Sequence, residues 1–466
     1  MASVVSRGAI ATLAGLVVHY ACFYLFGTPL ITDAIAQWVM ARTPNAYAVW
    51  ILQTLGPWAK PFAMTGALAA VGFAVYVGAL TRSYLLVPFA VLYGWLFDYH
   101  SVAGNLSFWV VALVLCRPSG TEVPTELKLA LQGRREVILM PLGVAAVALE
   151  SYLRDLHLAG AATKPVDIAP FQPPPDTFAP NLVRKNVTPV AEFYGMSKNT
   201  VDPAPDPRTW ALNLTVDGKL IRRITYSELL SLPRTSGYST MRCVSNTLKS
   251  DLMGTAQWTG IRLRQLINPA TLPTNIAEVA IVGVDGHGDS LPPAFAFSDG
   301  ALLALGMNGK TLDRTHGFPL RLIVPRYYGF KNVKWIGEIA FVTVPYSGTW
   351  PKMGYTKEPR VHTGCYIDRI VTTSEEVRVG GVAFAGDRGI NAVQVRADQG
   401  QWIDATVEPP LSPLTWRRWT AAIPAHSAFA IQARAMDATG AWQADRETPL
   451  FPDGVQGPTI RKAPRS

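Results

Sequence analysis

Cys243 lies in a sequence context that favours a thiolate. It belongs to the hexapeptide Met241-Arg-Cys-Val-Ser-Asn246, between a basic residue and a polar pair. A neighbouring cation and polar donors favour the ionised sulfur, which is the form that binds soft metals or attacks as a nucleophile. A lone cysteine is more often a small buried hydrophobic residue. The function of Cys243 therefore depends on the motifs around it.

Two further motifs follow in the chain. The first, between residues 251 and 266, contains Gly-Thr-Ala-Gln-Trp-Thr-Gly-Ile-Arg-Leu; the second joins His316-Gly-Phe-Pro-Leu-Arg321 to Tyr328-Gly-Phe-Lys-Asn-Val-Lys-Trp335. With Cys-Val-Ser-Asn they resemble, in order and spacing, the sulfite oxidase family of molybdopterin-dependent oxidoreductases, in a membrane-anchored bacterial form. The resemblance covers residues 186–456 and does not explain the first 160 residues.

This resemblance implies a cofactor and a set of residues that hold it. Cys243 would provide the protein's sulfur ligand to molybdenum (Mo), beside the dithiolene of molybdopterin. The other implied cofactor contacts are Tyr194, Asn246, Asp285, His316, Arg321, Asn332, Val333 and Lys334. Each residue alone has a plain structural explanation, such as a turn at Asp285-Gly. Jointly they match a pterin, whose amide-like edges and phosphate suit His, Asn and backbone donors and the cations Arg and Lys.

The residues expected at the mouth of the implied site differ from those of the sulfite oxidases. The tyrosine expected a few residues after Asp285 is absent, and a shorter loop brings His287 near its place; Arg326 replaces the glycine after Val-Pro. His287 and Arg326 are therefore the candidate catalytic residues beside Cys243. With Lys331 they would form a cationic funnel for an anion, unless Arg326 and Lys331 merely face solvent. These departures argue against sulfite and leave a small oxyanion or an S- or N-oxide open as substrate.

Composition indicates a membrane portion. The 466-residue chain has a mean hydropathy of +0.17 and only 16% charged residues. Its net charge of +9 comes from scattered basic residues without a Lys/Arg-rich run, so no nucleic-acid partner is expected. The four cysteines (Cys22, Cys116, Cys243 and Cys365) lack the spacing of a zinc site or haem attachment, and no disulfide is expected.

Apolar runs in the first 160 residues predict about five membrane spans. They lie at residues 8–27, 61–80, 137–149 and, as a short pair, within 84–116. Six basic residues (Arg7, Arg82, Arg117, Lys128, Arg134 and Arg135) then fall on one side of the membrane, and Arg42 and Lys60 fall on the other. The positive-inside rule places the N-terminus in the cytoplasm of a bacterial cell, and residues after 160 on the extracytoplasmic side. A single crossing in 84–116 would reverse this orientation.

Other features of this region bear on export and electron transfer. Arg134-Arg135 resembles an internal twin-arginine signal, which would export a domain already folded around its cofactor, although an ordinary positive-inside pair explains it equally well. His19 and His100 do not lie at matched depth, so haem is not expected. Because the chain contains no cytochrome-like domain, we expect a separate electron-transfer partner, either a cytochrome or a quinone-linked protein.

The expected architecture is multi-domain. It comprises an N-terminal α-helical transmembrane bundle in contact with membrane lipid (1–160), a Pro-rich linker that spaces the catalytic part from the bilayer (161–185), an α+β sulfite-oxidase-like molybdopterin domain (186–373), an immunoglobulin-like β-sandwich (374–456) and a tail (457–466). The resemblance adds a possible homodimer through the sandwich.

Two classes of function remain open at this point. One is an extracytoplasmic molybdenum enzyme that exchanges oxygen atoms and electrons with a small substrate. The other is a non-catalytic membrane anchor or assembly subunit that keeps the fold. The presence of Cys243, His316, Arg321 and Lys334 favours the enzyme, because a scaffold has no need of a metal thiolate.

Overall fold

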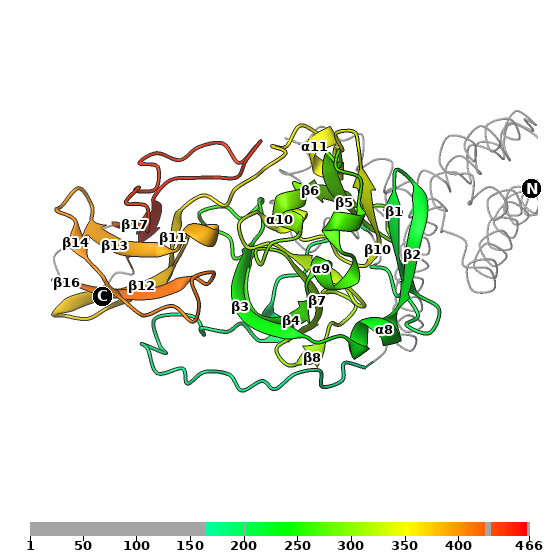
Figure 1. The fold of residues 1–466 in the computed structure, drawn as a ribbon. Coiled ribbons are helices and arrows are strands. Elements are labelled where there is room, and N and C mark those ends of the chain that lie inside the picture. Colours follow the sequence, from blue (N-terminus) through cyan, green and yellow to red (C-terminus); the bar gives the residue numbers. More distant parts are fainter. Residues whose placement is uncertain (1–163, 200–201, 425–429, 464–466) are drawn as a thin grey trace, which may run out of the picture. The chain divides into compact units, whose positions relative to one another are not determined.

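The computed structural model describes residues 164–199, 202–424 and 430–463. The predicted membrane spans, the Arg134-Arg135 pair, His19 and His100 lie outside these residues. Within the described ranges, no helix is both long and apolar enough to span a bilayer. Residues 161–196 and 203–466 form one compact unit (Figure 1).

Two five-stranded sheets form the region that carries the motifs. The first has the order β2-β1-β10-β5-β6, in which β1 and β10 are parallel and the other pairs antiparallel. Its strands are β1 (Ala211–Val216), β2 (Lys219–Thr225), β5 (Glu278–Gly283), β6 (Gly288–Leu291) and β10 (Ile336–Val342). The second contains β3 (Thr235–Arg242), β4 (Met253–Ile261), β7 (Leu302–Met307), β8 (Lys310–Thr311) and β9 (Arg321–Ile323), with β9 paired to β7.

Local sequence explains how the first sheet begins. β1 and β2 are joined at Asp217-Gly218, where both residues have positive φ, the conformation that a tight hairpin turn requires and Asp-Gly readily adopts. Thr225 then caps helix α8 (Tyr226–Ser231) in a reciprocal capping box with Glu228. Leu212 and Leu214 point from β1 into the core.

One hydrophobic core joins the two sheets. It includes Leu214 and Phe341 from the first sheet and Trp258 and Leu305 from the second. The helices are short: α8 has six residues, while α9 (Leu263–Leu266), α10 (Pro293–Ala296) and α11 (Thr349–Lys352) have four each. The expected α+β domain is therefore β-rich, because most of the buried apolar residues lie on strands rather than on helix faces.

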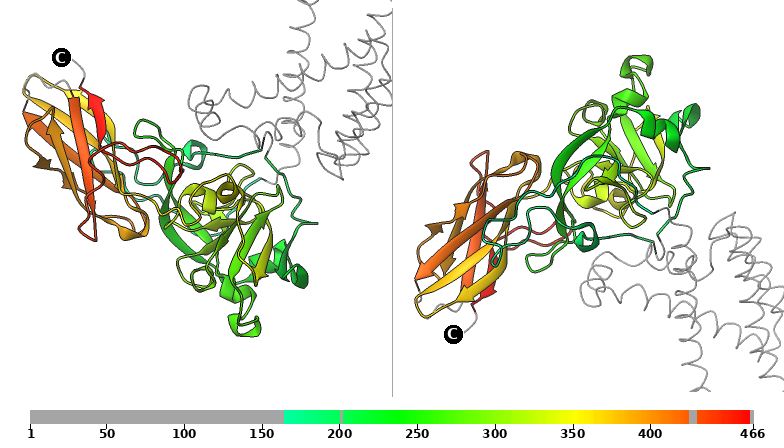
Figure 2. Two further views of the ribbon diagram at one scale, coloured as in Figure 1. Left: turned by 90° about the horizontal axis from the view of Figure 1, so that it is seen from above. Right: turned by 90° about the horizontal axis from the view of Figure 1, so that it is seen from below.

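The C-terminal strands form two antiparallel four-stranded sheets that share a second core (Figure 2). One sheet contains β11 (Gly364–Thr372), β12 (Glu376–Phe384), β16 (Arg417–Pro424) and β15 (Thr406–Val407); the other contains β14 (Ile403–Asp404), β13 (Ile390–Ala397), β17 (Ala430–Asp437) and β18 (Thr459–Lys462). β11 begins ten residues before the expected start at 374, and β18 extends beyond the expected end at 456. The immunoglobulin-like topology stays a prediction.

The Pro-rich segment differs from the free spacer that we expected. The backbone N–H groups of Ile168 and Ala169 donate to Gly309 O at 2.8 and 3.2 Å. The backbone of Asp167 forms an isolated antiparallel β-bridge with Lys310, the first residue of β8 (Figure 1). Asp176 makes an ion pair with Arg418 of β16. The described part of this segment therefore packs on the folded unit, through partners more than 130 residues away that the local sequence does not reveal.

Candidate functional site

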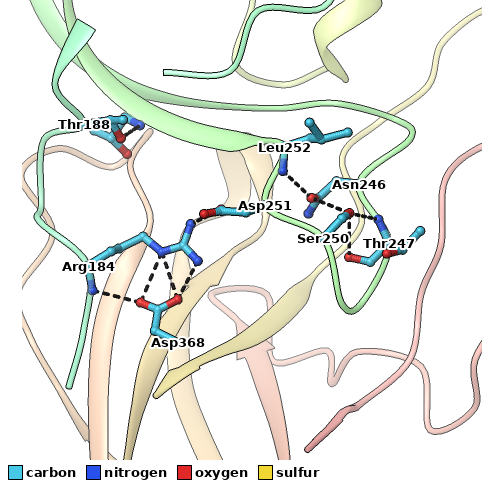
Figure 3. A network of polar contacts seen from close by, with 9 residues as sticks. Arg184, Thr188, Asn246, Thr247, Ser250, Asp251, Leu252 and Asp368 are labelled. Atoms are coloured by element: carbon cyan, nitrogen blue, oxygen red, sulfur yellow. Dashed lines mark hydrogen bonds and ion pairs between the residues drawn. The ribbon is translucent and has the colours of Figure 1, made fainter. Parts of the chain in front are cut away.

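The Cys243 loop connects β3 to β4 and is closed by hydrogen bonds. Cys243 N donates to Leu252 O at 2.9 Å, and its own carbonyl accepts from Asn246 N at 3.1 Å. The Oδ1 atom of Asn246 accepts from Leu252 N at 2.7 Å and from Ser250 Oγ at 3.1 Å (Figure 3). Asn246, which we expected beside the metal, thus fixes the shape of the loop that presents the sulfur.

Arg184 holds the far end of this loop. Its guanidinium makes an ion pair with Asp251, and its Nε donates to Asp368 of β11 at 2.9 Å (Figure 3). The same group lies 5.4 Å from the ring centroid of Trp416. Sequence reasoning missed Arg184, because Asp251 and Asp368 are 67 and 184 residues away and no local motif connects them.

Tyr194, His316 and Arg321 gather beside Cys243. Arg321 Nη1 donates to His316 O at 3.1 Å, and Nη2 contacts the sulfur of Met241, at the end of β3, at 3.0 Å. His316 Nε2 lies 3.1 Å from Val190 O, in the segment that carries Tyr194. The structure therefore brings these predicted residues together from three distant parts of the chain.

A close approach of the backbone connects Tyr194 to Cys243. A Cβ atom built on Gly329 would lie 2.7 Å from Tyr194 Oη and 3.6 Å from Cys243 Cα. Only a residue without a side chain fits between them. Gly329 begins the 3-10 turn η4 (Gly329–Lys331), which follows the second motif's Tyr328.

Three polar atoms of this cluster are buried without a hydrogen-bond partner: Tyr194 Oη, His316 Nδ1 and Arg321 Nε. An unsatisfied buried polar atom costs about 1 to 3 kcal/mol. Three such atoms around one cysteine indicate a place for a polar group that the protein itself does not supply. Amide-like edges and a phosphate offer acceptors for Tyr194 and Arg321, so the residues fit molybdopterin.

Burial sets the electrostatics of the cluster. It lowers the pKa of Arg321 to about 10, since no carboxylate within the described part of the chain forms an ion pair with this residue. It raises the pKa of Tyr194 well above its ordinary value. It also raises the pKa of the Cys243 thiol, although hydrogen bonds from Ser245 and the charge of Arg242 act in the opposite direction. Burial thus opposes the thiolate that the local sequence favours, and a bound metal cation would offset this effect.

The remaining residues of the second motif connect chain segments. Asn332 Oδ1 accepts from Val324 N at 2.7 Å, and the carbonyl of Val333 accepts from Leu322 N at 2.8 Å. Lys334 Nζ donates to Thr315 O at 2.8 Å and lies 4.1 Å from the ring centroid of Trp335. Lys334 is therefore next to the His316 segment, whereas Asn332 and Val333 fix the backbone that leads to it.

Asp285 and His287 lie in the turn between β5 and β6. Asp285 Oδ1 accepts from His287 N at 3.0 Å, and His287 Nε2 lies 3.1 Å from Phe330 O in η4. His287 therefore contacts the turn that contains Gly329. Its catalytic function stays a prediction.

The predicted cationic funnel is not formed as expected. Lys331 is 2% exposed, and its Nζ lies 2.7 Å from Asp289 Oδ1. Arg326 Nε lies 2.7 Å from Asp387 Oδ2, and the guanidinium lies 4.8 Å from the Phe295 ring centroid, at a separate cavity of about 460 Å³. Both cations are neutralised by carboxylates that are distant in sequence.

No group of three or more His, Cys, Asp or Glu side chains is arranged to bind a metal within the ranges that the structure describes. Cys243 offers one sulfur. Cys365, the other cysteine in these ranges, is fully buried in the C-terminal core.

Comparison with known proteins agrees with this geometry. The family described as "Oxidoreductase molybdopterin binding domain" matches residues 199–350. Mitochondrial sulfite oxidase of Rattus norvegicus is 25% identical over 364 residues, covering 67% of this chain and 65% of that protein. Sulfite oxidase of Arabidopsis thaliana is 26% identical over 296 residues, covering 52% of this chain and 75% of that protein.

A reductase and one solved structure are also similar. The catalytic subunit MsrP of the protein-methionine-sulfoxide reductase of Gluconobacter oxydans is 29% identical over 217 residues, covering 42% of this chain and 69% of that protein. The sulfane dehydrogenase SoxCD of Paracoccus pantotrophus has a TM-score of 0.50 at 20% identity, covering 55% of this chain and 74% of that chain, and it shows the fold alone. The chain spans 65% of the length of the rat protein and 54% of that of the Macaca fascicularis sulfite oxidase.

Proposed function

Because the chain belongs to the sulfite oxidase family of molybdopterin-dependent oxidoreductases, we propose that it is an oxygen-atom-transfer enzyme acting on a small S- or N-oxide. In the reductive direction an oxide R₂S=O takes up two electrons and two protons and leaves as R₂S and water. The electrons come from a separate cytochrome or quinone-linked partner.

The observation that carries the proposal is the buried cluster around Cys243. Cys243 would bind the metal, Arg321 and Lys334 would hold the phosphate, and His316 Nδ1 would meet a polar edge of the pterin. When bound, the molybdenum cofactor supplies a centre that exchanges one oxygen atom with two electrons. The protein fixes that centre and shapes access to it.

Individual residues have separate functions in this proposal. The hydroxyl of Tyr194 is a buried donor without a partner, and it would donate a hydrogen bond to an acceptor atom of the bound cofactor. Gly329 leaves the space for that hydroxyl. The surrounding rings of Phe193 and Trp258 exclude water, which strengthens each electrostatic contact in the cluster.

The paired charges at the predicted mouth of the site favour a neutral substrate over an oxyanion. Arg326 and Lys331, the cations predicted at the mouth, are paired with Asp387 and Asp289. A dianion such as sulfite would gain little from pairs whose net charge is zero. The similarity to a protein-methionine-sulfoxide reductase supports an S-oxide as the substrate class.

The cellular setting is part of the proposal. The apolar first 160 residues and the asymmetry of their basic residues support a multi-pass protein of the bacterial cytoplasmic membrane, with the catalytic domain outside. The two C-terminal sheets would form an immunoglobulin-like sandwich, and this sandwich is the proposed contact of a homodimer.

Elemental analysis combined with a substrate screen tests the proposal. The purified chain should contain about one molybdenum per molecule and should oxidise a reduced dye with dimethyl sulfoxide, methionine sulfoxide or trimethylamine N-oxide. Turnover of sulfite alone would contradict the substrate class. Protein without molybdenum, purified from a host that makes the cofactor, would favour the non-catalytic anchor or assembly subunit.

A further inference from the structure

Arg242 directly precedes Cys243, and its guanidinium is fully enclosed. Only 1% of the residue is exposed. Nη1 donates to His362 O at 3.1 Å, and Nη2 donates to Val455 O at 3.0 Å and to Asn246 O at 3.5 Å. The group therefore joins the Cys243 loop to two segments from the last quarter of the chain.

Two aromatic rings complete the surroundings of this cation. The guanidinium carbon lies 5.3 Å from the ring centroid of Tyr328 and 5.3 Å from that of Tyr366. Ring faces and carbonyl oxygens carry partial negative charge, and they stabilise a cation without neutralising it. A full positive charge thus remains beside the Cys243 loop.

Two other arginines of the unit have carboxylate partners. The half-buried Arg388 pairs with Asp437 at 2.8 Å, and the fully buried Arg418 pairs with Glu408 at 2.6 Å. In the ranges that the structure describes, Arg242 forms no such pair with a carboxylate. Because a buried charge without a counter-ion costs several kcal/mol, the fold would keep one here only if an anion completes it.

We infer that Arg242 is a positioning residue whose charge balances the metal-bound thiolate of Cys243 and whose three carbonyl contacts fix the loop that presents this sulfur. The inference rests on the proposed function, because it needs the thiolate of a bound cofactor. The anion next in the chain is then the counter-ion that Arg242 lacks.

The charge of Arg242 would affect the midpoint potential of a bound metal centre. A permanent cation in a low-dielectric surrounding stabilises the more negative, reduced state of a nearby metal centre, so it raises the midpoint potential. Removing the charge should therefore move the potential to more negative values. Loosening the loop without removing the charge should lower molybdenum retention and leave the potential in place.

Two substitutions in the full-length protein separate these effects. Arg242→Gln keeps a hydrogen-bond donor and removes the charge. Arg242→Lys keeps the charge but loses the planar set of N–H donors of the guanidinium. The measurements are molybdenum per chain and the midpoint potential from a redox titration followed by the Mo(V) paramagnetic signal. We expect a more negative potential in Arg242→Gln and a potential near that of the wild type in Arg242→Lys.

Arg388→Gln is the matched control. Arg388 holds the same segment as Arg242, through Val361 O at 3.1 Å and Thr363 Oγ1 at 3.0 Å, but its charge is paired with Asp437. It should lower thermal stability and leave the potential unchanged. An equal negative shift in Arg388→Gln would mean that loosening of the segment, not the charge, sets the potential, and would overturn the inference.

The remaining outcomes are also decisive. A molybdenum-loaded wild type with an unchanged potential in Arg242→Gln would overturn the inference alone. A wild type without molybdenum would overturn the proposed function and the inference with it. If Arg242→Gln binds no molybdenum, recovery of the metal at a near wild-type potential in Arg242→Lys supports the inference, and failure of this rescue overturns it.

Discussion

The guanidinium of Arg321 donates from Nη1 to the main-chain oxygen of His316 at 3.1 Å. This contact joins the two ends of the His316–Arg321 segment around the cis peptide bond Phe318-Pro319. The hydrogen bond holds the guanidinium in the space beside Cys243 and Tyr194. Within the described residues, this buried cation has no carboxylate partner. The first prediction follows from that unpaired charge.

Replacement of Arg321 by Met should weaken cofactor retention more than it weakens the fold. A hydrogen bond to a charged group contributes about 1.5 to 3 kcal/mol, and this contribution would be realised only when the cofactor's phosphate is present. The difference in melting temperature between loaded and cofactor-free protein should therefore shrink in Arg321→Met. An unchanged difference would show that Arg321 does not bind the cofactor.

A second prediction concerns the contact between Gly329 and Tyr194. A methyl group at Gly329 would lie 2.7 Å from Tyr194 Oη, so Gly329→Ala should destabilise the protein by about 1 to 3 kcal/mol. Tyr194→Phe removes that oxygen, and the double variant should regain most of the lost stability without regaining activity. Denaturant unfolding checks this. Additive effects of the two substitutions would contradict the close contact.

Arg184 should be needed to hold the Cys243 loop. Arg184→Gln leaves Asp368, whose side chain is 8% exposed, without its cation, which should cost about 1 to 3 kcal/mol. The loop should also become more accessible, so that limited proteolysis cuts near Asp251. Arg208→Gln is the control, because Arg208 pairs with Asp206 on the surface. Equal effects of the two substitutions on stability and cleavage would rule out a specific function for Arg184.

The Lys331–Asp289 pair makes stability depend on pH. Burial raises the pKa of Asp289, while the charge and hydrogen bond of Lys331 lower it. A folded-state pKa above the unfolded value means that stability is lost as pH rises through the folded-state pKa. Lys331→Met removes the contribution that lowers the pKa of Asp289. The loss of folding stability should therefore become larger and should extend to higher pH.

The free energy of unfolding, measured against pH, checks the Lys331 prediction. The variant should approach the wild type at acidic pH, where Asp289 is neutral, and fall about 3 to 5 kcal/mol below it near pH 7. Lys357→Met is the control, since Lys357 pairs with Glu278 in a more exposed position. A difference that stays constant at every pH would disprove the assignment to Asp289.

Motif order was the most informative signal in the sequence. The Cys243 motif and the segment from His316 to Arg321 could be associated because each motif is local and its spacing is preserved. The structure brings Cys243, Tyr194, His316 and Arg321 together.

Long-range pairing was not predictable from the sequence. Arg326 and Lys331 seemed free to attract an anion because Asp387 and Asp289 are 61 and 42 residues away. The Pro-rich segment looked like a spacer because its partners, Gly309 and Arg418, lie far along the chain. The expected α+β domain is β-rich, because strand residues form most of its core.

The most direct test of the account is the number of sulfur atoms bound to molybdenum. X-ray absorption at the molybdenum edge should show one sulfur fewer in Cys243→Ser than in the wild type, with pterin content and expression retained and turnover lost. Cys365→Ser, in the core of the C-terminal sheets, should leave the sulfur count and the activity intact. An unchanged sulfur count or full activity in Cys243→Ser would contradict the central claim that Cys243 binds the metal.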